Sequence, residues 1–219
     1  MSRGKTKRFL DNLTRDNIFE PGKEGYEEIK GNWNDRFFKN DNPITLELAC
    51  GRGEYTIGMS ALFSEENFIG VDIKGDRLWK GSGIAIEENL HNAAFLRTQI
   101  QLLDKFFTPG EVQGVWIMFP DPRPKKRDEK RRLTHDKFLD MYKSIIKPGG
   151  LVRLKTDNAD FFDYTLNVLQ ERKDIVDLNF THDLYNSEFA HECFDIVTRY
   201  EKIFTTKGSV IKYLRFAFK

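Results

Sequence analysis

Short apolar runs alternate with segments in which apolar residues recur at helical spacing, and this pattern begins at Ile44. The apolar runs predict five strands, at Ile44–Ala49, Phe68–Ile73, Ala93–Arg97, Val112–Phe119 and Leu151–Lys155. Helical spacing predicts helices over Tyr55–Phe63, from about Arg77 to Leu90, from a cap at Thr134 to about Ile146, and over Phe161–Leu169. Strands that alternate with helices are typical of βαβ units, so the chain is predicted to form a largely parallel sheet.

The two ends of the chain depart from this pattern. Residues 1–40 are polar with scattered glycines, and we expect them to form an irregular arm with short helical pieces. At the other end, strand-like runs at Val197–Phe204 and Val210–Phe218 surround a turn that contains glycine, which predicts a hairpin. The parallel sheet is therefore predicted to finish with an antiparallel strand. We expect an N-terminal arm over 1–40 and a single domain over 41–219.

The composition limits the class of protein. The chain has 219 residues, 39% of them hydrophobic, which suits one medium-sized globular domain. Its longest apolar run, Val115–Phe119, is far shorter than the roughly 20 residues of a membrane helix, so no membrane association is expected. The two cysteines and four histidines lack the spacing of metal sites. We therefore expect no metal, and a cytoplasmic location in a reducing environment.

Charge is balanced overall, at +1 from 35 basic and 34 acidic residues, but it is unevenly distributed. The segment Arg123–Arg132, called the basic segment below, contains seven basic and two acidic residues. A second basic island lies within residues 3–8. Two such islands in a neutral chain indicate local contact with a polyanion, although an ordinary solvated loop is the alternative interpretation.

A ligand-binding signal follows the first predicted strand, in Leu46-Glu-Leu-Ala-Cys-Gly-Arg-Gly53. Gly51 and Gly53 allow the tight turn and close backbone approach that nucleotide sites use at the carboxyl edge of a sheet. Glu47 would repel a pyrophosphate, but it can pair with the sulfonium or ammonium group of S-adenosylmethionine. Asp72, at the end of the second strand, can accept hydrogen bonds from both ribose hydroxyls. These residues together predict a site for that cofactor.

A second signal runs from Val115 to Leu133, where a strand is followed by F-P-D-P-R-P and then by further cations. Prolines at 120, 122 and 124 stiffen the turn that carries Asp121 to the carboxyl edge of the sheet. A rigid carboxylate can accept hydrogen bonds from the N1–H and N2–H edge of guanine, while neighbouring cations bind RNA phosphates. The predicted phosphate contacts are Lys126, Arg127, Lys130, Arg131 and Arg132.

These motifs together resemble the bacterial tRNA (guanine-N7)-methyltransferase family. The F-P-D-P segment is similar to the family's F-P-D-P-W-P-K-x-R-H-x-K-R-R-L signature, and L-E-L-A-C-G-R-G is similar to its L-E-x-G-x-G-x-G loop. The K-P-G-G, K-T-D and T-R-Y-E elements follow in the family's order, at 147–150, 155–157 and 198–201. The resemblance implies an α/β, Rossmann-like class I S-adenosylmethionine-dependent methyltransferase fold. Its sheet would be mostly parallel and seven-stranded, with an antiparallel C-terminal strand.

The resemblance also implies roles for individual residues. Glu47, Asp72 and Asp121 would line the cofactor side of the site. The target nucleotide would contact Lys125, Asp157, Thr198, Arg199, Tyr200 and Glu201. Considered singly, Asp72 and Asp157 could instead cap helices, and Glu201 could pair with a lysine across the terminal hairpin.

The chain departs from the family pattern at four positions. Gln99 stands where the family usually has an acidic residue near the adenine, and its amide can still bind the adenine amino group. Ala49 replaces a loop glycine, which is tolerable if φ stays negative at this position. Arg123 and Asp128 stand where Trp and His are usual.

The implied activity is methyl transfer from S-adenosylmethionine to N7 of the variable-loop guanine (position 46) of tRNA. N7 carries an in-plane lone pair and no proton, so its attack needs no general base. Asp121 is the predicted catalytic residue, because a carboxylate can stabilise the positive charge that develops on the ring. The alternatives are a methyltransferase for another substrate class and a non-catalytic RNA-binding module on the same scaffold. The sequence is compatible with a monomer or a homodimer.

Overall fold

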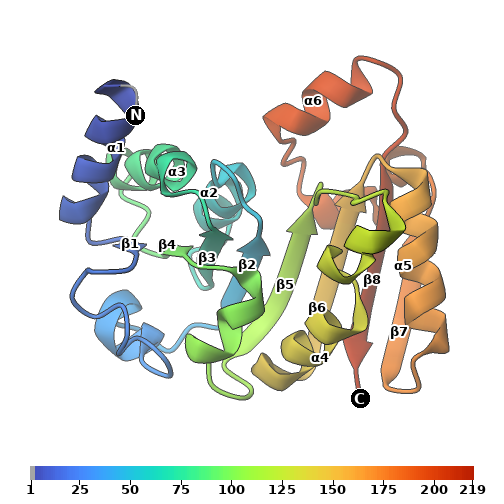
Figure 1. Cartoon of the computed structure of the whole chain (residues 1–219), viewed down its shortest axis with the longest axis horizontal. Coiled ribbons are helices and arrows are strands. Elements are labelled where there is room, and N and C mark those ends of the chain that lie inside the picture. The colour runs from blue at the N-terminus through green and yellow to red at the C-terminus, as the bar shows by residue number, and fades with distance from the viewer. Residues whose placement is uncertain (1–2) are drawn as a thin grey trace.

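The computed structural model describes residues 3–219, and an eight-stranded sheet forms its centre, in the order β1-β4-β3-β2-β5-β6-β8-β7 (Figure 1). The strands are β1 (Ile18–Phe19), β2 (Ile44–Leu48), β3 (Asn67–Asp72), β4 (Ala93–Arg97), β5 (Val112–Met118), β6 (Ile146–Thr156), β7 (Ile175–Thr181) and β8 (Lys212–Phe218). Pairing is parallel from β1 to β6, whereas β8 is antiparallel to both β6 and β7. The predicted mostly parallel sheet with an antiparallel C-terminal strand is confirmed, and the two-residue β1 extends it.

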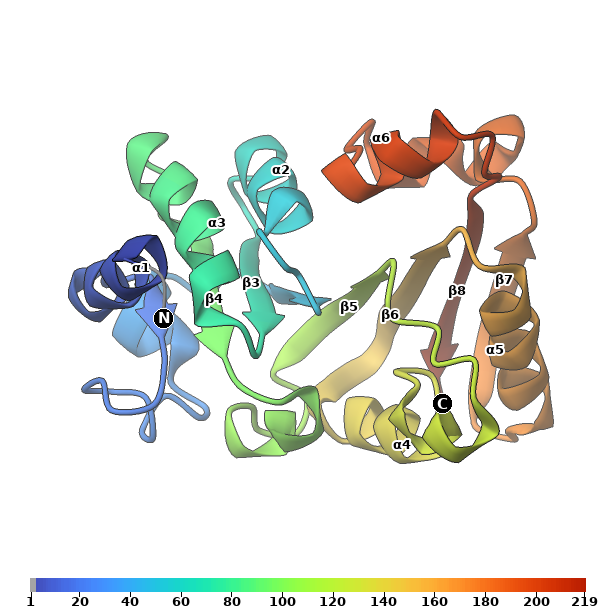
Figure 2. The same ribbon diagram turned by 45° about the horizontal axis from the view of Figure 1, so that its top comes forward.

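Helices cover both faces of the sheet. The α-helices are α1 (Arg3–Thr14), α2 (Glu54–Leu62), α3 (Gly75–Glu87), α4 (Asp136–Ile145), α5 (Ala159–Glu171) and α6 (Arg199–Thr205). Shorter turns of helix are η1 (Trp33–Phe38), η2 (Ile100–Lys105), η3 (Lys126–Arg131), η4 (Leu184–Asn186) and η5 (Glu188–Cys193). Side chains of α4 and α5 pack on one face of the sheet, and those of α2 and α3 pack on the other. The result is a three-layer α/β arrangement, seen obliquely in Figure 2.

The strand order reverses between β2 and β5. From β2 the chain crosses outward to β3 and β4, and it then returns to place β5 on the other side of β2. In such sheets the loops at the carboxyl ends of the two central strands diverge and leave a crevice, which is the usual ligand position. The topology therefore directs the segment after Leu48 and the segment after Met118 to one place.

The N-terminal region has more regular structure than the sequence predicted. Helix α1 packs beside α3, and β1 pairs with β4. Ile18 of β1 and both Trp33 and Phe38 of η1 have buried side chains. Trp33 also donates a hydrogen bond from its indole N–H to the carbonyl of Phe106, at 2.9 Å. Residues 3–40 therefore cover one end of the sheet, and the division of the chain at residue 40 stays a prediction.

The predicted terminal hairpin is wrong. The stretch Val197–Phe204 is not a strand, because Thr198 caps α6: its hydroxyl accepts a hydrogen bond from the backbone N–H of Glu201 at 3.1 Å. Instead, β8 lies between β6 and β7 and is antiparallel to both, and β7 forms the edge of the sheet. An eight-residue apolar pattern is too short to separate helix from strand, and the buried position of Glu201 fixes the helix.

The cap of α4 also differs from the prediction. The capping residue is His135, whose Nδ1 accepts a hydrogen bond from the backbone N–H of Lys137 at 3.3 Å. Thr134 is buried instead, and its hydroxyl lies 2.8 Å from the hydroxyl of Thr165 in α5. The Thr134 hydroxyl, which was predicted to cap the helix, therefore connects the start of α4 to α5 by a hydrogen bond.

Candidate active site

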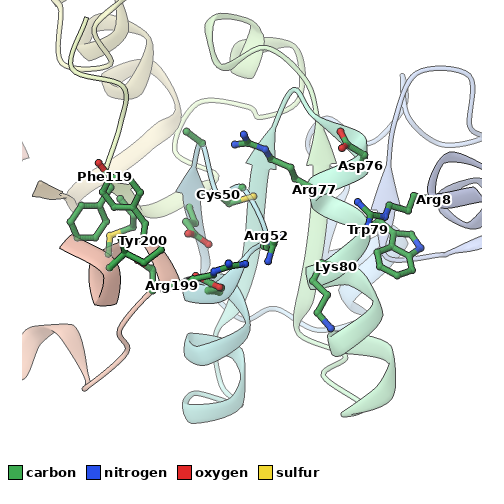
Figure 3. A pocket seen from close by; sticks show the side chains of 17 residues that line it. Arg8, Cys50, Arg52, Asp76, Arg77, Trp79, Lys80, Phe119, Arg199 and Tyr200 are labelled. Carbon is green, nitrogen blue, oxygen red and sulfur yellow. The ribbon is translucent and has the colours of Figure 1, made fainter. Parts of the chain in front are cut away.

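A cavity of about 610 Å³ opens at the carboxyl ends of β2 and β5, where the strand order reverses. Its walls come from the glycine loop after β2, from Met118 at the end of β5 and Phe119 after it, and from residues of α1, α3 and α6 (Figure 3). A volume of this size is within the range of small-molecule sites. The cavity lies where the motifs predicted a cofactor.

The glycine loop has the tight turn that its sequence indicates. Gly51 and Gly53 have φ values of +58° and +69°. A Cβ at Gly53 would overlap the ring of Phe95, so this position accepts no side chain. Ala49 has φ of +56°, which corrects the expectation of a negative φ at this position. An alanine is therefore held in the left-handed conformation, which costs about 1–2 kcal/mol relative to the right-handed one.

Glu47, in β2, borders the cavity and is only 5% exposed. Its Oε2 accepts hydrogen bonds from the backbone N–H and the hydroxyl of Thr56, at 2.7 and 2.5 Å. Its Oε1 forms no hydrogen bond with any residue that the structure describes. Burial raises the pKa of Glu47 to about 8, against the opposing effect of the Thr56 hydrogen bonds. The negative charges of Glu54 and Asp72 raise it further.

Asp72 connects the glycine loop to the start of α3. Its Oδ2 accepts a hydrogen bond from the backbone N–H of Gly51 at 3.0 Å, and its Oδ1 accepts one from the backbone N–H of Lys74 at 2.8 Å. The carboxylate is 7% exposed and does not itself border the cavity. Each oxygen of Asp72 keeps a second lone pair for a ligand.

Gln99 is exposed, lies outside the cavity lining, and accepts a hydrogen bond from Gln101 at 2.8 Å.

Asp121 lies on the rigid turn after β5, two residues beyond the cavity wall at Phe119. Its side chain is 61% exposed and forms an ion pair with Arg123 at 3.1 Å. Phe119 and Arg123 both have positive φ, at +47° and +48°. Two non-glycine residues in this conformation within one turn indicate backbone strain of the kind that gathers at functional sites. The carboxylate is therefore held near the cavity in an exposed position.

Helix α6 forms the wall opposite α3. Thr198, Arg199 and Tyr200 at its start all border the cavity (Figure 3). The backbone N–H of Arg199 donates to Glu54 of α2 at 2.7 Å, and the Tyr200 ring lies 5.3 Å from that of Phe119. The pKa of Tyr200 is raised by burial and then by the negative charge of Asp157, which places that carboxylate nearby.

Glu201 points away from the cavity, into the protein. It is fully buried and pairs with the equally buried Lys155 of β6 at 2.7 Å, and it also accepts a hydrogen bond from the Tyr185 hydroxyl. Glu201 does pair with a lysine, but that lysine belongs to β6 and not to the predicted hairpin. Removing one partner of such a pair costs about 3–5 kcal/mol. The pair therefore anchors α6 to the carboxyl end of the sheet.

Sequence reasoning did not assign roles to Lys155 and Tyr185. A signal for Lys155 existed, because a lysine that ends a buried apolar strand needs a partner. Tyr185 lies in η4, in a polar stretch with no regular pattern, and nothing in the sequence connects it to Glu201. The ring of Trp79, which also borders the cavity, could not be found from its place in α3.

The basic segment follows the Asp121 turn and contains η3. Four of its cations, Lys125, Lys126, Arg127 and Lys130, are exposed. Arg131 is exposed but pairs with Asp128 at 3.2 Å. Arg132 is directed inward: its guanidinium carbon lies 4.1 Å from the Tyr164 ring centroid, and its guanidinium donates to the Arg123 carbonyl at 3.2 and 3.3 Å. Arg132 therefore holds the turn, Arg123 pairs with Asp121, and the other five cations face solvent.

Two further properties concern the whole described chain. Within residues 3–219, no group of three or more His, Cys, Asp or Glu side chains is placed to hold a metal ion. In the same residues, no helix combines the length and apolar character that crossing a bilayer requires.

Cys50 and Cys193 are buried and unbonded, and burial raises the pKa of both thiols.

The fold is similar to that of many solved structures, among them methyltransferases. A structure titled "Structure of an Antibiotic Related Methyltransferase" matches with a TM-score of 0.61 and 14% identity, over 83% of this chain and 89% of that chain. The 16S rRNA methyltransferase KamB matches with a TM-score of 0.61 and 10% identity, over 84% and 92%. Fold and site together define the class I methyltransferase architecture.

Sequence comparison gives a narrower result. A family model described as "Putative methyltransferase" matches residues 41–214. A tRNA (guanine-N(7)-)-methyltransferase of Cytophaga hutchinsonii is 51% identical over 100% of this chain and 99% of its own length. Proteins of the same name from Christiangramia forsetii and Bacteroides fragilis are 43% and 40% identical, over 100% and 99% of this chain and 99% and 86% of their own lengths. The chain belongs to the tRNA (guanine-N(7)-)-methyltransferase family.

Proposed function

We propose that this protein transfers a methyl group from S-adenosylmethionine to N7 of a guanine in tRNA, in the variable loop at position 46. The observation that carries the proposal is the 51% identity, over the whole chain, with a relative named for this reaction. The cavity at the reversal of strand order supports it, because that is where a sheet of this topology binds a nucleotide-like ligand.

The residues around the cavity fit S-adenosylmethionine. Gly51 borders the cavity and has open space beside its Cα, so its backbone can lie against a ligand, whereas Gly53 packs against the buried ring of Phe95 and supports the turn. The free Oε1 of Glu47 is suited to a cationic group, and Asp72 is suited to ribose hydroxyls. We assign Gln99 to the adenine end as a weaker contact, because its side chain is exposed and bonded to Gln101. The cofactor supplies a methyl group on a positively charged sulfur, which makes that methyl electrophilic.

Asp121 is the proposed catalytic residue. Its exposed carboxylate can accept hydrogen bonds from the N1–H and N2–H edge of guanine, which orients N7 toward the cavity. The same charge stabilises the cationic ring that forms when N7 is methylated. To bind the base, the Asp121 carboxylate must accept hydrogen bonds from guanine in addition to its ion pair with Arg123, or in place of that pair. The ion pair is exposed and therefore weak enough to be displaced.

The target nucleotide is proposed to lie between the Asp121 turn and α6. Lys125, Asp157, Thr198, Arg199 and Tyr200 are the contacts we assign to it, and Tyr200 offers a ring that is 42% exposed. Glu201 acts through Lys155 by fixing α6, so we place it in a positioning role. The guanine must leave its tertiary contacts in folded tRNA to reach this position.

The neighbouring basic segment is proposed to bind tRNA phosphates. Lys126, Arg127 and Lys130 are its freest cations, whereas Arg131 must exchange Asp128 for a phosphate. The turn held by Arg132 keeps these cations in a fixed relation to Asp121. We propose the cytoplasm as the compartment, because the tRNA substrate is found there and because its reducing environment is compatible with the unbonded Cys50.

The decisive experiment is to incubate the protein with labelled S-adenosylmethionine and bulk tRNA and to map the product. We expect 7-methylguanosine in the variable loop, and no product from tRNA in which that guanine is replaced by adenine. Label in another nucleoside or in a non-RNA substrate would show a methyltransferase of another substrate class. Binding of tRNA with no label transferred would show a non-catalytic module.

A further inference from the structure

Five cations from four separate segments surround the mouth of the cavity, and we call them the cationic rim. They are Arg8 of α1, Arg52 of the glycine loop, Arg77 and Lys80 of α3, and Arg199 of α6 (Figure 3). All five are exposed. None of them lies in the basic segment, which follows β5. The fold therefore brings Arg8, from the basic island at residues 3–8, together with four cations that the sequence leaves isolated, and so creates a second cationic surface.

The rim cations lack anionic partners. Among residues 3–219, none of their side chains forms an ion pair or donates a hydrogen bond, although other arginines such as Arg97 and Arg172 pair with carboxylates. Only three acids border the same cavity: Glu47, Glu54 and Asp76. Of these, Glu47 is buried and Glu54 accepts a hydrogen bond from the α6 backbone. The five cations therefore outnumber Glu54 and Asp76, the two less buried acids of the lining, and positive charge predominates at the mouth.

The rim is built on fixed elements. The guanidinium carbon of Arg8 lies 5.2 Å from the centroid of the Trp79 ring, and that ring donates its indole N–H to Asp11 at 2.8 Å. Asn12 of α1 also donates to the carbonyl of Gly75 in α3, at 2.9 Å. Helix α1 is therefore bonded to α3, which keeps Arg8 at the cavity. Arg77 and Lys80 are three residues apart on α3 and share one face of it.

S-adenosylmethionine alone does not explain why five cations gather here. The cofactor has a single carboxylate, and its two oxygens can contact two of the cations at most. Resting on the proposed function, we infer that the cationic rim binds phosphodiesters of the tRNA strand that crosses the cavity mouth. The RNA backbone then passes between α3 and α6 while the basic segment binds a different stretch. Contact on two sides of the cavity would hold the extruded guanine over the methyl donor.

The test replaces two rim cations to which the proposed function assigns no contact with cofactor or guanine, in the variant Arg77→Ala/Lys80→Ala. The control variant is Lys105→Ala/Lys147→Ala, which removes the same charge from exposed positions near the opposite edge of the sheet, where Ile146 pairs with Val112 at the start of β5. Binding of fluorescently labelled tRNA is measured from 50 to 300 mM KCl without cofactor. Binding of S-adenosylmethionine is measured by calorimetry, and circular dichroism checks the fold.

Each phosphate contact contributes about 0.7–0.9 to the slope of log affinity against log salt, or about five- to eightfold in affinity at 0.1 M salt. The rim variant should therefore bind tRNA about 25- to 60-fold more weakly, with a slope smaller by about 1.5. The control should bind like the wild type. Both variants should keep wild-type affinity for S-adenosylmethionine.

Two results would overturn the inference. In the first, the rim variant binds tRNA as the control does. In the second, it loses cofactor affinity along with tRNA affinity, which would assign the cations to the cofactor. Failure of the proposed function looks different: the wild type would bind tRNA without forming 7-methylguanosine, and the binding comparison would still decide the rim. A wild type that does not bind tRNA would refute both.

Discussion

Affinity for S-adenosylmethionine should rise with pH, because Glu47 must ionise to pair with a cationic ligand. In the free protein, burial raises the pKa of this carboxyl to about 8. The neutral form therefore predominates at pH 7, and binding must remove its proton. The substitution Glu47→Gln tests this reasoning, since the amide oxygen can still accept both hydrogen bonds from Thr56 while the charge is lost.

The expected size follows from the fraction of ionised Glu47. With a pKa of about 8, that fraction is about 0.3% at pH 5.5 and about 9% at pH 7. Apparent affinity scales with the population of the competent state, so it should increase about 30-fold over this range. The ligand's own amino group stays protonated below pH 7 and does not contribute. About 0.9 proton should be released per cofactor bound at pH 7.

Isothermal titration calorimetry at several pH values, in buffers of different ionisation enthalpy, measures both quantities. The Glu47→Gln protein should bind weakly at every pH and release no proton. S-adenosylhomocysteine, which lacks the sulfonium charge, should show a smaller pH dependence. Equal affinity at pH 5.5 and pH 7 in the wild type, with no proton release, would refute the assignment of Glu47.

The same raised pKa gives stability the opposite pH dependence. Folding favours the neutral acid, so this contribution is fully present below about pH 4.5 and is lost as the pH rises through about 8. The free energy of unfolding of the cofactor-free protein should therefore fall over this window. Urea denaturation should show a flatter dependence for Glu47→Gln, and an identical profile in the two proteins would contradict the buried, neutral carboxyl.

Three further predictions follow from the site. Asp121→Asn should leave the thermal midpoint and cofactor affinity unchanged while turnover falls sharply, because it removes charge from an exposed side chain; wild-type turnover would exclude a catalytic role. Ala49→Gly should raise the free energy of unfolding by about 1 kcal/mol, because glycine adopts positive φ without strain, and a loss in urea titration would argue against strain at this position. Combined replacement of Lys126, Lys130 and Arg131 by Ala should lower the salt slope of tRNA binding by about two, less than three full contacts, because Arg131 is already paired. An unchanged slope would make the basic segment an ordinary surface.

The central strands and the glycine loop could be predicted from the sequence because their signals are local. A strand buried on both faces appears as a continuous apolar run, and β3, β4 and β5 contain such runs, whereas Thr45 and Glu47 interrupt the one in β2. A tight turn between strand and helix requires glycine, so Gly51 and Gly53 mark it directly. Asp121 was predicted at the carboxyl edge for the same reason, because prolines end its strand at a definite residue.

Only the tertiary structure decided which distant residues meet. The sequence around Val197–Phe204 fits a strand or a helix, and the buried pair between Glu201 and Lys155 selects the helix. The cationic rim joins α1, the glycine loop, α3 and α6, and of its five cations only Arg8 lies in a basic island that the sequence shows. Such contacts join residues that are far apart in the sequence. They are fixed because a buried charge without a partner, or an apolar face left in water, would destabilise the folded protein. A local sequence pattern does not show which distant residue supplies the partner.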